Sequence, residues 1–246
     1  MSRIFAVLLA VVLGACGARI PIVERLEADE LYARAVERLE ARRWDDAVEA
    51  FERFVYRFPG DPRQQQARFR LAEAYFGKRE YLTAGVEYTR FAGDYPNSEW
   101  SDDARFGACR AYFELAPRPS LDQQYTESAI EHCRTMAEYY PESEFAPRAR
   151  ELVAELTNRL ALKHFEMAEH YFRRRAYDSA LMGYNDVLAF FPGTPAAPRA
   201  LLRMVEVYDR LGYAEEQEET RARLLREYPS SEEARQVQQQ AVAGRP

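Results

Sequence analysis

The sequence has few of the residue patterns that catalytic and metal sites require. Its 246 residues include only three histidines, and two of these, His164 and His170, stand six positions apart, which is not the spacing of metal ligands on one helical face. The third is His132. No H-E-x-x-H, G-x-S-x-G or P-loop pattern occurs, and acidic pairs such as Asp45-Asp46 are typical of helix starts. We therefore expect a protein that is not an enzyme and holds no cofactor or metal.

Basic blocks and strand-like runs are also scarce. The formal net charge is −6 and no Lys/Arg-rich block stands out, so a nucleic-acid partner has little support. Alternating Val/Ile-rich runs are few, and only 11 glycines and 13 prolines interrupt a chain rich in helix-forming residues. With 47% hydrophobic and 30% charged residues, the chain can bury a core and still face water. These features predict an all-α protein.

Long hydrophobic runs are absent after residue 15. Ile4–Ala15 is apolar or small and follows a basic start, and its twelve residues fit the core of a signal peptide better than a membrane span. The run ends in "LGAC", which resembles a bacterial lipobox. This resemblance implies cleavage before Cys16, acylation of its thiol and, because Gly17 follows, sorting to the outer membrane. The alternative is an ordinary signal peptide that happens to contain a cysteine.

An aromatic-proline dipeptide recurs along the chain and sets the architecture. The intervals between its prolines are 37, 45, 51 and 37 residues, which is typical of a solenoid of helical pairs. An alanine stands twelve residues before and another eight residues after each of the first four prolines, where helices need small residues to approach. Each unit then consists of helix A, a turn, helix B and a proline, and resembles a tetratricopeptide repeat. The dipeptides are Phe58-Pro59, Tyr95-Pro96, Tyr140-Pro141, Phe191-Pro192 and Tyr228-Pro229.

Two irregularities modify this pattern. Pro117 and Pro119 force a longer loop inside the third unit, and the segment from about Ala146 to Arg174 reads as one long helix, or two helices joined with little break. The prediction is a tetratricopeptide-like α-solenoid of about five helical pairs with a long central helix. Its parts are a signal peptide (1–15), a lipidated cysteine and tether (16–28), repeats one to three (29–141), the long helix with repeats four and five (142–240), and a disordered tail (241–246).

Three stretches resemble the BamD-type lipoproteins of the outer-membrane β-barrel assembly machine. They are "ELYARAVERLEARRWDDAVEAFERFVYRFP" in the first repeat, "QQQARFRLAEAYFGKREYLTA" in the second, and "YYPESEFAPRARELVAELTNRLALKHFEMAEHYFRRRAYDSAL" across the long helix and fourth repeat. The resemblance implies a lipid-anchored adaptor on the periplasmic face of the outer membrane. Its N-terminal repeats would receive unfolded β-barrel substrates, and its C-terminal repeats would hold the central assembly subunit beside other assembly lipoproteins. One departure is Gly183, where enteric members have an arginine that contacts the main assembly subunit. A periplasmic tetratricopeptide scaffold of cell-envelope or division machinery is the alternative function.

The repeat register also predicts a row of groove-facing side chains. Helix-A residues three before and four after the central small residue point into the concave face, with Ala35, Ala72 and Cys109 as centres. Either the row is extra packing, or it is a groove for an extended peptide with aromatic side chains, whose terminal carboxylate Arg57, Arg68, Arg70 and Arg110 could steer. The groove positions are Tyr32, Leu39, Phe69, Phe76, Phe106 and Phe113.

Two smaller sets of residues complete the candidates. The resemblance implies exposed docking positions for the central subunit on the fourth and fifth units, at Tyr177, Tyr184 and Arg199. Cys109 and Cys133 fall on the two helices of the third unit. In an oxidising compartment they either form a disulfide or pack as two small core residues.

Overall fold

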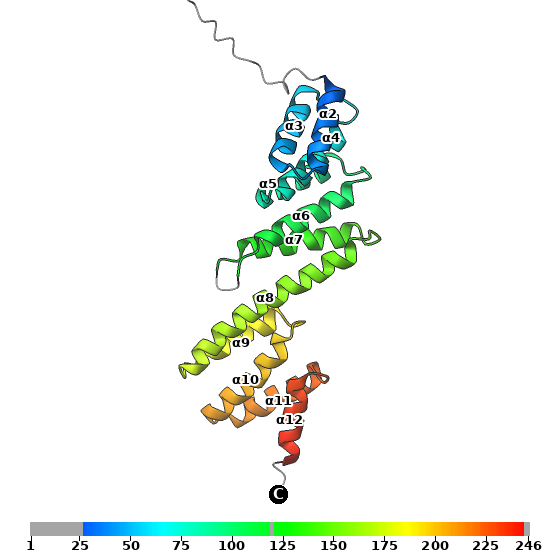
Figure 1. Ribbon diagram of the computed structural model, residues 1–246. Helices are drawn as coiled ribbons and strands as arrows, with labels where there is room; N and C mark the ends of the chain where they lie inside the picture. Colours follow the sequence, from blue (N-terminus) through cyan, green and yellow to red (C-terminus); the bar gives the residue numbers. More distant parts are fainter. Residues whose placement is uncertain (1–26, 119–120, 244–246) are drawn as a thin grey trace, which may run out of the picture.

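The structure is a computed structural model that describes residues 27–118 and 121–243. The predicted signal peptide and Cys16 lie outside the described residues. The described chain forms eleven α-helices and no strand, stacked as successive pairs into an elongated solenoid (Figure 1). The pairs are α2 (Ala28–Glu40) with α3 (Trp44–Arg57), α4 (Gln64–Gly77) with α5 (Tyr81–Asp94), α6 (Ser101–Leu115) with α7 (Gln124–Tyr139), α8 (Ala146–Arg173) with α9 (Tyr177–Phe190), and α10 (Ala196–Leu211) with α11 (Ala214–Glu227), followed by α12 (Glu232–Ala243).

The aromatic-proline dipeptides form one repeated turn between helix B and the next helix A. The carbonyl of Phe58 accepts a hydrogen bond from the backbone N–H of Asp61 at 3.1 Å, so Pro59 occupies the second position of a β-turn. Proline suits that position because its ring presets φ, and it ends the helix because it has no N–H to donate. Equivalent hydrogen bonds of 3.0–3.1 Å are accepted by the carbonyls of Tyr95, Tyr140, Phe191 and Tyr228.

A second repeated turn joins helix A to helix B, and sequence reasoning did not anticipate its conformation. Arg42, Arg79 and Arg175 have positive φ values of 55°, 67° and 60°, and Gly212 has 76° at the equivalent place in the fifth unit. After each, a backbone N–H reaches back five residues to a helix carbonyl, as from Arg43 to the carbonyl of Arg38 at 2.8 Å. This bond caps the helix C-terminus, and it holds arginine in a region that normally favours glycine.

The long helix α8 belongs to two separate cores. Its first half contributes Leu152 to a cluster with Cys109, Cys133 and Met136 of α6 and α7. From Ala161 onward it joins a second cluster built with α9, α10, α11 and α12. At 28 residues, α8 is about 42 Å long. It crosses between the N-terminal and C-terminal helices in Figure 1, as expected for a rigid spacer.

The third unit carries the irregular features that its prolines indicated. Its two helices are joined by a long connection from Ala116 to Gln123, and they are also joined by a disulfide between Cys109 and Cys133. The Cα atoms of the two cysteines lie 4.5 Å apart, and both side chains are fully buried. Of the two interpretations that the sequence left open for Cys109 and Cys133, the structure contains the disulfide.

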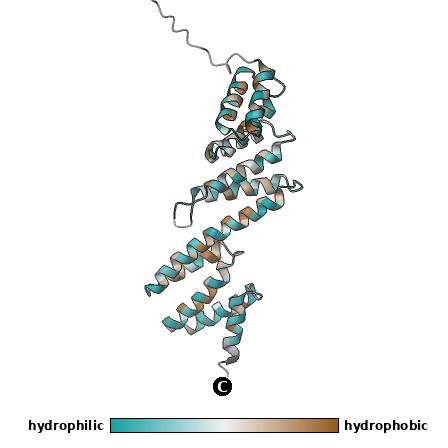
Figure 2. Cartoon of the chain, in the orientation of Figure 1, coloured by the Kyte–Doolittle hydropathy of each residue, from teal (hydrophilic) through white to brown (hydrophobic). Residues whose placement is uncertain are grey.

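The C-terminal end and the surface complete the fold. Helix α12 extends to Ala243, so residues 241–243 are helical and the predicted tail begins too early; residues 244–246 lie outside the described part. Figure 2 shows hydrophobic and hydrophilic residues mixed within the helices, as expected of helices that pack in pairs with one side facing water. Within the described ranges, no helix has both the length and the apolar character needed to cross a bilayer.

Candidate partner-binding surfaces

The predicted groove positions do not form an open apolar row. Phe69 is buried, with its ring centroid 5.5 Å from that of Phe91, 5.9 Å from Tyr88 and 6.2 Å from Trp100. The prediction that Phe69 lines a groove is therefore wrong: repeat register fixes the helix face, but rings from α5 and the following turn fill the space in front of it. The remaining groove positions, Tyr32, Leu39, Phe76, Phe106 and Phe113, are half-buried.

Arginine side chains cover the half-buried aromatic rings. The guanidinium of Arg63, just before α4, lies 5.0 Å from the ring centroid of Tyr32 on α2. Arg159 of α8 lies 5.3 Å from the centroid of Phe113 on α6. The cation comes from the residue just before the next helix A in the first case and from the next helix A itself in the second, so stacking of successive repeats brings arginine and aromatic together. We call this surface the inner face; it consists of the half-buried groove positions and the arginines over them, Arg63, Arg110 and Arg159. The inner face is therefore cationic and aromatic, not purely apolar.

Arg110 stands at the centre of this surface. Its guanidinium lies 4.6 Å from the ring centroid of Phe76 on α4 and 6.0 Å from that of Phe106 on its own helix. Phe106 stacks in turn on Phe145 at 4.9 Å, with 11° between the ring planes. Two flat rings thus hold the arginine stem in place, while the side chain remains exposed.

Charge pairing distinguishes Arg110 from the other arginines that cover the row. Arg63 pairs with Asp61 at 2.8 Å, and Arg159 pairs with Glu155 at 2.6 Å. Arg110 has no carboxylate of a described residue within 4.0 Å. The Arg110 guanidinium is therefore held in position by its neighbours and can still donate hydrogen bonds to a bound carboxylate.

The other arginines predicted to steer a carboxylate are placed differently. Arg57 lies over the ring of Phe58 at 5.2 Å, and Arg70 pairs with Glu73 at 2.8 Å. Arg68 lines a hollow of about 400 Å³ between α3, α4 and α5, which Tyr56 also lines. Of the four predicted arginines, Arg110 alone both contacts groove aromatics and lacks an ion pair within the described chain.

Acidic groups on α4 and α6 make the inner face responsive to pH. Burial raises the pKa of Glu73 and outweighs the opposing effect of Arg70. Burial also raises the pKa of Asp103, with a further contribution from Asp102. The charge of Asp103 also helps to raise the pKa of Glu73, because the two carboxylates repel each other when both are ionised.

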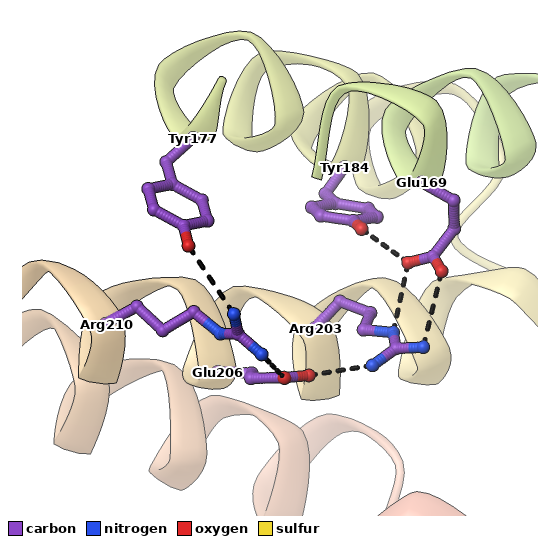
Figure 3. A network of polar contacts seen from close by, with 6 residues as sticks. All are labelled: Glu169, Tyr177, Tyr184, Arg203, Glu206 and Arg210. Carbon is purple, nitrogen blue, oxygen red and sulfur yellow. Dashed lines mark hydrogen bonds and ion pairs between the residues drawn. The ribbon is translucent and has the colours of Figure 1, made fainter. Parts of the chain in front are cut away.

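A polar network ties α8, α9 and α10 together in the C-terminal half (Figure 3). The hydroxyl of Tyr184 donates to the carboxylate of Glu169 at 2.5 Å, and Arg203 pairs with the same carboxylate at 3.0 Å. Tyr184 is fully buried, so the prediction that it is an exposed docking residue is wrong. Its ring packs into the core beside Phe165, and its hydroxyl finds the partner that a buried phenol requires.

The network continues along α10 toward the start of α9. Glu206 accepts from Arg203 and from Arg210, each at 2.7 Å, and Arg210 reaches the hydroxyl of Tyr177 at 3.5 Å (Figure 3). Burial of Glu206 opposes its ionisation, but hydrogen bonds from the two arginines outweigh this effect and lower its pKa. Tyr177 is half-buried and packs on Phe172, so it offers only part of its ring to a partner.

Arg199 is the third predicted docking residue, and it is exposed. Its guanidinium lies 4.4 Å from the ring centroid of Phe165 on α8, and no described carboxylate lies within ion-pairing distance. Arg199 in the C-terminal half thus repeats the arrangement of Arg110 in the N-terminal half: an exposed cation fixed over an aromatic ring of the preceding helix A.

The histidines show no shared site. The ring of His132 stacks on Tyr112 with centroids 4.3 Å apart, and burial, followed by the charge of Arg105, lowers its pKa. His164 lies 5.2 Å from the ring of Phe191, while His170 is exposed. Among the residues that the structure covers, no three possible ligands gather around a common point.

Comparison with known proteins identifies the family. The family described as outer membrane lipoprotein (YfiO) matches residues 24–224. The chain belongs to this family. Similar proteins include the outer membrane protein assembly factor BamD of Caulobacter vibrioides, 26% identical over 92% of this chain and 75% of the relative, and that of Vibrio cholerae, 26% identical over 84% and 90%. A solved structure titled TPR2AB-domain:pHSP90-complex of yeast Sti1 aligns over 84% of this chain and 80% of its own, with 17% identity and a TM-score of 0.47.

At position 183 this member of the YfiO family has a glycine, whereas the resemblance to BamD-type proteins implies an arginine. A Cβ built on Gly183 would lie 2.8 Å from the Cβ of Ala168 and 3.3 Å from its Cα. Because α8 and α9 approach so closely here, a long side chain at position 183 does not fit between them without a shift of one helix. A partner contact at this position would therefore need a different residue in this chain.

Proposed function

We propose that the protein is a lipid-anchored adaptor on the periplasmic face of the outer membrane that takes part in assembling β-barrel proteins. Membership of the outer membrane lipoprotein family and similarity to proteins named as outer membrane protein assembly factors support this function. The predicted lipobox ending at Cys16 supports the anchor. The solenoid of helical pairs supports a role in binding proteins rather than in catalysis.

The exposed arginine that two phenylalanines hold in place carries the proposal for substrate binding. An extended peptide places alternate side chains on one face, so aromatic residues of a barrel strand would lie beside the Arg110 side chain and the half-buried rings of Phe76 and Phe106. The terminal carboxylate of the same peptide would then pair with Arg110, which has no ion pair within the described residues. We assign the client-binding role to this inner face of α4 and α6.

The C-terminal half is assigned the complementary role of holding the central assembly subunit. Arg199 supports this assignment because it is exposed and fixed over Phe165. The network around Glu169 and Arg203 makes the surface behind it rigid. A rigid surface with a positioned cation suits a stable docking site, because little side-chain freedom is lost on binding.

Two matched variants, Arg110→Gln and Arg199→Gln, test both roles at once. Arg110→Gln should weaken binding of a barrel C-terminal peptide about tenfold, the loss expected for one charge-assisted hydrogen bond, and should leave retention of the central subunit unchanged. Arg199→Gln should do the reverse when the mature chain is used to co-purify envelope proteins in mild detergent. Each variant is the folding control for the other.

A peptide with an amidated C-terminus separates carboxylate recognition from general charge attraction. It should bind the wild type about as weakly as the free-acid peptide binds the Arg110→Gln protein. If amidation changes nothing, the carboxylate role is wrong. If the central assembly subunit does not co-purify with the unaltered chain, the adaptor function itself is wrong.

A further inference from the structure

A small hollow with unbalanced positive charge lies on the first helical pair. It has a volume of about 170 Å³ and is lined only by α2, α3 and the turn between them. Such a volume holds roughly five or six water molecules, which is the size of a phosphate group with its first waters. Its lining residues are Arg34, Arg38, Arg43, Asp46, Glu49 and Ala50.

The two carboxylates of the hollow are already neutralised by other arginines. Asp46 pairs with Arg43 at 2.5 Å, across the start of α3. Glu49 pairs with Arg53 at 2.9 Å, one turn further along the same helix. Each lining carboxylate therefore already has an ion-pair partner other than Arg34 and Arg38.

Arg34 and Arg38 are the lining cations that form no ion pair with any residue the structure describes. They stand four residues apart on α2, so they project side by side from one face of the helix, and both are half-buried. Neither has a carboxylate of any described residue within 4.0 Å. Two neighbouring guanidinium groups in a concave site form the donor set that binds phosphate oxygens well.

We propose that this hollow, the Arg34–Arg38 site, binds the phosphate of an anionic phospholipid headgroup. The choice of a lipid over a soluble anion rests on the proposed anchor: Ala28, the first residue of α2, is twelve positions from Cys16, and twelve residues span at most about 40 Å. The first helical pair is thus the part of the described solenoid nearest to the acylated cysteine along the chain. A bound headgroup would fix the orientation of this pair on the membrane surface.

Local recognition, rather than general attraction, is what the charges of α2 support. The helix carries four acidic residues, Asp29, Glu30, Glu37 and Glu40, against the two arginines. An acidic helix does not concentrate on an anionic bilayer through net charge. Binding to anionic vesicles should therefore depend on the hollow itself and weaken strongly when Arg34 and Arg38 are replaced.

The test uses the mature chain from position 16 with Cys16→Ser, so that no acyl chain contributes. This protein should co-sediment with vesicles of phosphatidylcholine and phosphatidylglycerol, and not with phosphatidylcholine alone. Arg34→Gln with Arg38→Gln should reduce the partition coefficient about 30-fold, or about fivefold for each arginine. Arg34→Lys with Arg38→Lys keeps both charges but removes the forked donors, so it should bind clearly less than the wild type; wild-type binding by this variant would show general charge attraction instead of a site.

The matched control is Arg173→Gln with Arg174→Gln, which removes the same charge from two exposed arginines at the end of α8 and the start of the turn after it. It should bind vesicles as the wild type does. Equal binding of the Arg34/Arg38 variant and the control overturns the site, as does equal binding to both vesicle types. If inorganic phosphate saturates the Arg34–Arg38 site but the protein does not bind vesicles, the ligand is a soluble anion and the assignment to a lipid headgroup is wrong. None of these outcomes depends on whether Cys16 is acylated, so a failure here leaves the proposed function standing.

Discussion

The disulfide of the third unit should contribute a large share of the stability of the N-terminal half. It joins two helices across a sequence separation of 24 residues. On the chain-entropy model, closing a loop of that length lowers the conformational entropy of the unfolded chain by the equivalent of about 3.5 kcal/mol. The cross-link keeps the loop closed in the unfolded state, so folding no longer has to supply that free energy. Reduction of the wild-type protein should therefore lower the free energy of unfolding of this region by about 3–4 kcal/mol.

The chain offers a convenient probe for this measurement. Its two tryptophans, Trp44 and Trp100, both lie in the N-terminal half, and Trp100 stacks on Phe69 in the core between α4 and α6. Urea unfolding followed by tryptophan fluorescence, with and without reductant, therefore reports on the half that contains the disulfide. A solenoid need not unfold as one unit, so the C-terminal half should be followed separately by hydrogen exchange.

Two controls separate the cross-link from other effects of reduction. Cys109→Ala with Cys133→Ala should unfold near the midpoint of the reduced wild type, lower only by the small loss of two buried sulfurs, and should not respond to reductant. Hydrogen exchange in α10 and α11 should be unchanged. If reduction shifts the free energy of unfolding by less than about 1 kcal/mol, the loop-closure reasoning is refuted.

Two further predictions concern close packing and charge. Gly183→Ala should destabilise the C-terminal half by about 1 kcal/mol in urea unfolding, because the clash with α8 exceeds the helix-propensity gain of about 1 kcal/mol; a stabilised variant would show that α8 and α9 separate easily. Acidification should change the stability around Glu73 and Asp103 and the stability around Glu206 in opposite directions. The raised pKa values of Glu73 and Asp103, caused first by burial, mean that stability around α4 and α6 increases as pH falls through those values toward the ordinary carboxyl pKa. The lowered pKa of Glu206, where arginine hydrogen bonds outweigh burial, means that stability around α10 is lost as pH falls from 4.5 through its folded-state pKa. Hydrogen exchange corrected for intrinsic rates, at neutral and acidic pH, checks this; equal shifts in both halves would contradict it.

The sequence predicted the backbone better than the surface, for a physical reason. Proline, small residues and helical periodicity act locally, so the turns at the aromatic-proline dipeptides and the bounds of α8 followed from the sequence. How deeply a side chain on a given helix face is buried depends instead on residues that are distant in the sequence. Phe69 and Phe76 occupy related register positions, yet Trp100 and two rings of α5 bury the first, while Arg110, 34 residues away in sequence, covers the second. Tyr184 was misplaced for the same reason.

The arginines at positive φ show another limit of sequence reasoning. A left-handed residue is usually sought as glycine, and Gly212 has that identity in the fifth unit. In three other units the same turn is held by Arg42, Arg79 or Arg175, at a cost of about 1 kcal/mol each relative to glycine. The signal that was present is positional: each arginine falls between two predicted helices of the same repeat, where the chain must reverse.

The long helix gives the two proposed binding surfaces a fixed relation to each other. Leu152 of α8 packs with α6 and α7, whereas Phe165 and Phe172 of the same helix pack with α9 and α10. Leu156 and Leu160, between these segments, are buried but belong to neither cluster. A change in the angle between the halves must therefore bend a continuous helix or pull it out of one core, since no flexible linker lies between them. In the proposed adaptor, α8 would therefore transmit the position of a partner on α10 to the inner face of α4 and α6 as a rigid displacement and not through a hinge.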